Sequence, residues 1–149
     1  MADGLPRVAA PVRKIPRALR DIAVAARADV VRVTEDPKLT DRCAVASVYL
    51  QVIAAEKGFD LELVGGEVHI RQAWYRRTGH LWCEYQGWIV DLSATQFWSV
   101  PEVYVTSVTN GRYTEHDRGL VTFGRCTHME LVTKLLTELG VNRFSRGRR

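Results

Sequence analysis

Strand-like segments follow one another between residues 59 and 107 with no helical pattern between them. FDLELVGGEVHI, at 59–70, alternates apolar and polar residues around a Gly-Gly pair, and GHLWCEYQGWIVD, at 79–91, carries two apolar runs on either side of Gln-Gly. A third run, PEVYVTSV, follows at 101–108. Consecutive strands without crossover helices pair antiparallel, because a parallel pair needs a long connection. The pattern argues against a doubly wound parallel sheet and predicts an α+β fold.

Segments with helical spacing flank these strands. RALRDIAVAARADVVRV, at 17–33, repeats apolar residues three and four positions apart, and HMELVTKLLTELG, at 128–140, predicts an amphipathic final helix. CAVASVYLQVIAAEKG, at 43–58, is apolar around most of its circumference, which predicts the most buried helix of the fold. Thr40 or Asp41 is well suited to cap its first turn.

Length and composition favour a single domain. A chain of 149 residues, 46% of them hydrophobic, is long enough for one core. We expect an N-terminal arm and helix at 1–33, a core at 40–140 and a basic tail at 141–149. No apolar run reaches the roughly 18–20 residues that span a bilayer, and the N-terminus lacks the apolar region of a signal peptide. These features predict a cytoplasmic protein without a membrane partner.

The net charge of +4 comes largely from the two ends of the chain. Such tails are usually solvated, but a basic tail also binds nucleic acid in some proteins. The residues that would then contact phosphates are Arg143, Arg146, Arg148 and Arg149.

The hairpin around Gln-Gly sets a histidine and an aspartate on one face of the sheet. If Gln86 and Gly87 form a two-residue turn, Trp82 lies opposite Asp91. His80 then points to the same face, diagonal to Asp91, with about 7–8 Å between the backbones. A four-residue loop would preserve this parity and a three-residue loop would reverse it. The contact has a structural interpretation as a cross-strand pair, but a carboxylate after WIV needs a partner, and His80 is the obvious candidate.

Cys43 supplies the third group of a nucleophilic set. The first turn of a helix stabilises a thiolate through its free N–H groups and dipole. A small buried hydrophobic residue is the alternative interpretation, and Cys83 is predicted to be such a core residue. Together, Cys43, His80 and Asp91 are the groups needed for Cys/His/Asp catalysis, in which the backbone N–H of Cys43 would be one oxyanion donor.

The helix opening at Cys43, followed by GHLWCEYQGWIVD, resembles the core of the transglutaminase-like, papain-fold superfamily. The form GHxWxE…GWxxDxxxxQF also resembles small bacterial and phage members of that superfamily. The match covers roughly residues 40–97. It implies a papain-like core in which the central helix carries the cysteine and packs on an antiparallel sheet. It also implies Cys43 as nucleophile, His80 as base and Asp91 as orienting acid, with a protein or peptide substrate and no cofactor.

This chain departs from that superfamily beside the nucleophile. No glutamine precedes Cys43 as an oxyanion donor, so Gln96 or the indole N–H of Trp82 would have to substitute. Arg42 stands where a small residue is common, and its side chain would narrow the cleft or meet an acidic substrate.

The expected activity is acyl transfer from an amide through a thioester, hydrolytic in a protease or deamidase, with transglutamination as another branch. The alternative is a catalytically inactive papain-fold module that binds a protein or a nucleic acid. Cys126 and His128 lack the paired ligands of a zinc site, so no metal is predicted.

Overall fold

The computed structural model describes residues 10–71, 75–118 and 132–137. Its helices are α1 (Arg17–Thr34), α2 (Cys43–Glu56) and the short 3-10 helix η1 (Ala94–Gln96). Its strands are β1 (Glu62–Arg71), β2 (Tyr75–Tyr85), β3 (Trp88–Asp91), β4 (Tyr104–Ser107) and β5 (Tyr113–Arg118). Residues 132–137 are also helical, whereas Cys126, His128 and the basic tail lie outside the described residues.

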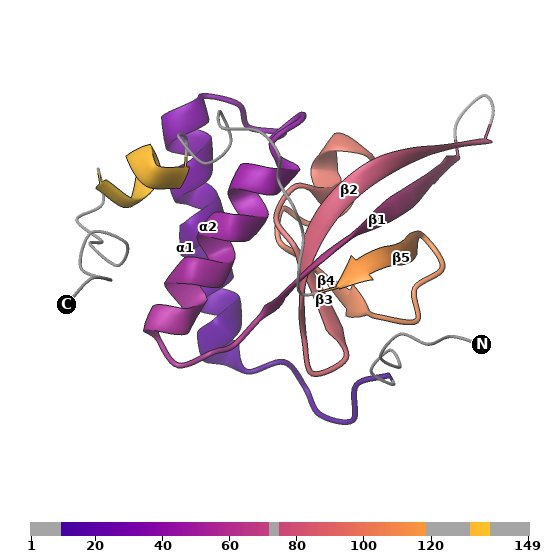
Figure 1. Ribbon diagram of the computed structural model, residues 1–149, viewed down its shortest axis with the longest axis horizontal. Helices are drawn as coiled ribbons and strands as arrows, with labels where there is room; N and C mark the ends of the chain where they lie inside the picture. The colour runs from indigo at the N-terminus through magenta and orange to yellow at the C-terminus, as the bar shows by residue number, and fades with distance from the viewer. Residues whose placement is uncertain (1–9, 72–74, 119–131, 138–149) are drawn as a thin grey trace.

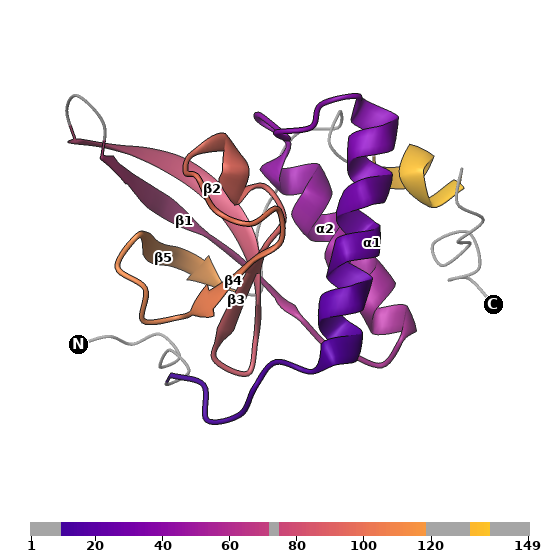
Figure 2. The ribbon, with the colours of Figure 1, turned by 180° about the vertical axis from the view of Figure 1, so that it is seen from behind.

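The strands form one antiparallel sheet in the order β4-β3-β2-β1-β5. Both long helices lie on the same side of it, with α2 between α1 and the sheet (Figures 1 and 2). This arrangement confirms the predicted α+β class, with the central helix packed on an antiparallel sheet. None of the helices within the described residues is both long and apolar enough to cross a membrane.

The helix-covered side of the sheet holds an apolar core. Helix α2 is buried around most of its surface, as its composition predicts. Helix α1 belongs to this core rather than to a separate arm, because its apolar stripe is fully buried against α2. The stripe consists of Leu19, Ala23, Ala26 and Val30. From the sheet, the same core receives Leu63, Cys83 and Val90, and Leu92 joins it from just after β3.

The opposite side of the sheet holds a second, more aromatic cluster. Trp82 and Tyr113 are buried at its centre, and their rings meet edge to face at 4.9 Å. Phe97, Trp98 and Tyr104 pack against it from the segment that follows η1 and from β4.

The β2–β3 hairpin has the predicted two-residue turn. Gln86 and Gly87 both have positive φ, 47° and 87°, as the tight hairpin turns require. Tyr85 pairs with Trp88, and the two preceding pairs of β2 and β3 continue the same register. The side-chain parity inferred from the sequence is therefore correct.

Two features of β1 and β5 complete the sheet. From the sequence, Gly65-Gly66 is either a hairpin turn or a bulge between two short strands; the structure has the bulge, against β5, but within one continuous strand. A Cβ at Gly66 would lie 2.0 Å from the carbonyl oxygen of Thr114, so only glycine lets β5 approach this closely. NGRYTEHDRGLVTF, at 110–123, has the sequence of a polar turn leading to a short strand, and within it Tyr113–Arg118 is already a strand because it pairs with β1.

Candidate active site

His80 and Asp91 form a hydrogen-bonded pair inside the protein. Nε2 of His80 lies 2.8 Å from Oδ2 of Asp91, and neither side chain is exposed to solvent. The diagonal contact across the hairpin is thus present as predicted. The edge of the Phe97 ring packs on the imidazole at 4.8 Å and restricts its orientation.

Asp91 is fully buried and accepts hydrogen bonds from three residues, His80, Tyr113 and Ser93. The Tyr113 hydroxyl donates to Oδ2 at 2.8 Å, so this oxygen is shared with His80. The backbone N–H of Ser93 donates to Oδ1 at 2.9 Å, and the Ser93 hydroxyl lies 3.4 Å from the same atom. A fully buried carboxylate is stable only with such a set of partners.

The pair fixes the charge of both residues. Burial raises the pKa of Asp91, but the charge and hydrogen bond of His80, followed by Ser93 and Tyr113, bring this pKa below its usual value. Burial lowers the pKa of His80, but Asp91 outweighs this effect and, with a contribution from Cys43, raises the pKa to about 9. At neutral pH the site therefore holds an imidazolium and a carboxylate. Tyr113 keeps its proton because burial and Asp91 both raise its pKa.

Cys43 is the first residue of α2, and its thiol lies near the His80–Asp91 pair. It is partly exposed, and it lies close enough to His80 to raise the pKa of the imidazole. Because Nε2 of His80 is bonded to Asp91, Nδ1 is the ring nitrogen that remains for an interaction with the Cys43 thiol. Nδ1 is buried and has no hydrogen-bond partner among the described residues. The imidazole is thus held on one side and open to the thiol on the other.

The first turn of α2 is not capped by Thr40 or Asp41, contrary to the sequence expectation. Arg42 is the N-cap residue, and its side chain makes no cap hydrogen bond. Asp36 instead accepts bonds from the backbone N–H groups of residues 38–40 and folds the preceding loop on itself. The first helical bond runs from Ala46 N–H to the Arg42 carbonyl, so the N–H of Cys43 keeps no helical partner.

Cys83 provides an internal contrast. It is fully buried on the helix-covered face, where its thiol donates to the Ser47 carbonyl at 3.2 Å. Burial and the nearby carboxylates of Asp91 and Glu84 raise its pKa well above the usual range. This is the core role that strand alternation predicts.

Arg27 is a residue of the site region that the sequence did not indicate. It lies on α1, is 4% exposed, and donates to the Leu92 carbonyl at 2.8 Å. It also donates to the Pro37 carbonyl at 2.7 Å and to the Thr95 hydroxyl at 3.1 Å. Arg27 thus joins the segment after Asp91 to the loop before Cys43. The sequence shows only an arginine next to apolar helix positions, and this does not distinguish a buried side chain from a solvated one.

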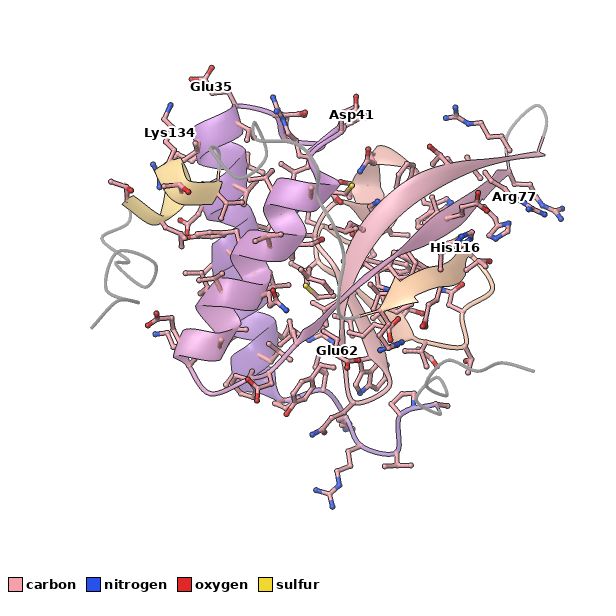
Figure 3. The ribbon with its side chains drawn as sticks, in the orientation of Figure 1. Glu35, Asp41, Glu62, Arg77, His116 and Lys134 are labelled. Carbon is pink, nitrogen blue, oxygen red and sulfur yellow. The ribbon has the colours of Figure 1, made fainter. Side chains whose placement is uncertain are left out.

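The three secondary candidates differ in outcome. Trp82 is fully buried and its indole N–H donates to Glu84 at 2.9 Å, so it is neither a free oxyanion donor nor an exposed substrate platform. Gln96 lies beside the nucleophile loop, where its Oε1 accepts from the Asp41 N–H at 3.1 Å. Asp41 stands just before α2 (Figure 3). Arg42 is half-buried, and its Nε has no hydrogen-bond partner among the described residues.

Comparisons with protein-family models, with curated protein sequences and with solved structures find no significant match to this chain.

Proposed function

We propose that this chain is a cysteine-dependent acyl-transfer enzyme of the transglutaminase-like, papain-fold type. The observation that carries the proposal is the state of His80. Its Nε2 is bound to a buried carboxylate, and its unpartnered Nδ1 is left for the Cys43 thiol. This is the order of groups that a Cys/His/Asp triad requires. The sequence resemblance over residues 40–97 gives the same three residues.

In the proposed reaction, the Cys43 thiolate attacks the carbonyl carbon of an amide, and the C=O electron pair moves to oxygen. Collapse of the tetrahedral intermediate breaks the C–N bond, and His80 gives its proton to the departing nitrogen. A thioester on Cys43 and a free amine result. Asp91 keeps the imidazole oriented and stabilises its charge throughout.

Hydrolysis completes the cycle. Water attacks the thioester carbon while His80 takes one proton from it, and the C–S bond breaks to give the acid and the thiolate. An amine in place of water would make the reaction a transglutamination. We expect a protein or peptide substrate. What binds beside the thioester decides between protease, deamidase and transglutaminase activity.

The oxyanion of the intermediate needs donors near Cys43. The uncapped first turn of α2 leaves the Cys43 N–H for this purpose. Gln96 is the second candidate, because its side chain reaches the loop before Cys43, where its Oε1 accepts a hydrogen bond from the Asp41 N–H. Gln96→Ala should then lower kcat by about 10²–10³-fold while the alkylation rate of Cys43 stays within about twofold.

Thiol reactivity tests the proposal without a known substrate. Iodoacetamide at about pH 6, with adducts assigned by peptide mapping, should label Cys43 faster than Cys83, and His80→Ala should abolish this advantage. Asp91→Asn is the matched variant that keeps the imidazole but removes its counter-charge, and it should give an intermediate rate. Equal labelling of the two cysteines, or no effect of His80→Ala, would favour the inactive binding module.

Intact-mass analysis then identifies the reaction. Incubation with candidate protein substrates should produce either an acyl adduct on Cys43 or a gain of about one mass unit in the substrate, the change from amide to acid. Cys43→Ala protein is the control, and it should produce neither.

A further inference from the structure

A cavity of about 370 Å³ lies at the outer end of β1. It is lined by His69, Arg71, Trp98, Gly111 and Arg112. These residues come from the outer end of β1, the segment after η1 and the turn between β4 and β5. In the register of the sheet His69 faces Arg77, which marks this end of the sheet in Figure 3.

The two arginines of this cavity have no acidic partner among the residues that the structure describes. Among the described residues that line the cavity, none has an acidic side chain. Within the described part of the chain, neither Arg71 nor Arg112 lies within salt-bridge distance of a carboxylate. By contrast, the guanidinium of Arg118 contacts the carboxylates of Glu62, Glu84 and Glu115.

Arg112 is nevertheless held in one place. Its guanidinium lies over the Trp98 ring, 4.8 Å from the ring centroid, and donates to the Tyr104 hydroxyl at 3.1 Å. Its backbone carbonyl accepts from the His69 N–H at 2.9 Å. An arginine with a fixed guanidinium and no acidic partner is suited to bind a carboxylate, because the planar fork can donate two parallel hydrogen bonds.

The cavity shares a wall with the candidate active site. Trp98 packs on Tyr113 at 5.5 Å between ring centroids, and the Tyr113 hydroxyl donates to Asp91. Trp98 also packs at 5.5 Å on Phe97, which contacts the His80 ring. A substrate seated against Trp98 is therefore one layer of aromatic side chains away from the imidazole.

We propose that this cavity binds a carboxylate of the substrate, so that the protein acts on an acidic peptide segment. This proposal rests on the acyl-transfer function and adds its substrate class. The carboxylate is either an acidic side chain or a free C-terminus, which present the same group to Arg71 and Arg112.

Two observations favour a peptide over a nucleic acid. The cavity accommodates a group of side-chain size, whereas single-stranded nucleic acids follow extended basic grooves. Arg112 covers one face of the Trp98 ring, which reduces the ring surface on which a base could stack.

Binding to full-length Cys43→Ala protein tests the proposal without turnover. The probes are acetyl-Gly-Glu-Gly-amide, its Gln isostere, and triglycine with either a free or an amidated C-terminus, each followed by two-dimensional NMR. A carboxylate probe should shift the Trp98 indole and the Gly111 and Arg112 amides saturably, and its neutral counterpart should bind at least about tenfold more weakly. The carboxylate probe that saturates the shifts at the lower concentration shows whether the cavity prefers an acidic side chain or a free C-terminus.

Three matched charge removals locate the binding. Arg71→Gln alters an exposed residue and should weaken binding of the better carboxylate probe about tenfold, as should Arg112→Gln. Arg76→Gln removes the same charge from the neighbouring strand without touching the cavity, and it should change binding less than about twofold. Thermal melts of each variant check that the fold is kept. If Arg112→Gln does not fold, the binding measured with Arg71→Gln decides the test.

Equal binding of charged and neutral probes, or an equal loss in Arg76→Gln and Arg71→Gln, would overturn the proposal. So would saturation by a phosphoserine peptide or by oligothymidylate in the absence of binding by either carboxylate probe. Because Cys43 is absent from the binding assay, its result is separate from the alkylation test. If the cavity binds the carboxylate probes but Cys43 is not selectively alkylated, the proposed catalysis is refuted and the carboxylate site stands. If Cys43 is selectively alkylated but the cavity does not distinguish charged from neutral probes, only the carboxylate site is refuted.

Discussion

On the face of the sheet that α1 and α2 cover, the buried side chains are almost all apolar, whereas the opposite face also buries charged groups. Val90 and Cys83 lie on the first face, and their neighbours Asp91 and Glu84 lie on the second. Stability on the helix-covered face comes from packing. On the other face it depends on complete partnering, since a buried charge without a partner costs several kcal/mol, roughly 3–5 when one member of a pair is removed.

The two cysteines show the same contrast for reactivity. Cys83 is buried in the apolar core and its pKa is raised, whereas Cys43 is partly exposed at the first residue of α2, near His80. The difference teaches that residue type does not decide the role of a thiol here. Its position relative to the buried His80–Asp91 pair does.

The largest expected effect comes from removing the carboxylate of that pair. Asp91→Ala leaves a buried imidazolium without its counter-ion and the donors of Tyr113 and Ser93 without an acceptor. We expect it to lower the free energy of unfolding by about 3–5 kcal/mol, measured by urea denaturation. Val90→Ala, one residue away on the apolar face, is the control and should cost about 2 kcal/mol. A smaller loss for Asp91→Ala than for Val90→Ala would refute the contrast between the faces.

The second effect is a pH dependence of stability carried by His80. Its pKa is raised from 6.5 to about 9 in the folded state, so its stabilising contribution is full below about pH 6.5 and is lost as the pH rises to 9. Asp91, whose pKa is lowered, contributes above about pH 4 and loses its contribution as the pH falls. The pair therefore stabilises most between about pH 4 and 6.5.

Urea unfolding at pH 6 and pH 9 measures this dependence. The protein should lose about 3 kcal/mol more than His80→Gln over this interval. The comparison with His80→Gln also subtracts the contribution of Cys83, whose raised pKa makes the folded state less favourable at high pH in both proteins. Parallel losses in the two proteins would show that His80 is not the group that titrates.

A third effect concerns the close approach of β5, which brings Tyr113 to Asp91. Gly66→Ala would push a methyl group against the Thr114 carbonyl oxygen, and we expect a cost of about 2 kcal/mol. Gly79→Ala, whose Cβ would meet only an atom at 4.0 Å, is the matched control and should be tolerated much better. Equal thermal stability of the two variants would contradict the close approach.

The sequence predicted those parts of the site that follow from local periodicity. The hairpin parity that places His80 and Asp91 together follows from alternation and from a two-residue turn, and the buried α2 follows from its composition. The partners Tyr113, Arg27 and Ser93 were not predictable in this way. Tyr113 lies in a polar segment that becomes a strand only by pairing with β1, and Arg27 reaches two loops 10 and 65 residues away along the chain. Long-range hydrogen bonds of this kind leave no periodic trace in a sequence.

The smallest expected effect isolates one such partner. Tyr113→Phe keeps the ring packed against Trp82 and removes only the hydroxyl that donates to Asp91, so we expect a loss of about 1.5 kcal/mol. With one donor fewer, the carboxylate is less stabilised and should take up its proton at a higher pH, which moves the acid-unfolding midpoint upward. Tyr104→Phe removes a hydroxyl of the same aromatic cluster that contacts Arg112 and Asn110 instead, and it should leave that midpoint unchanged. If both variants moved the midpoint equally, the buried network around Asp91 would not be the source of the effect, and the polar face would derive its stability from aromatic packing alone.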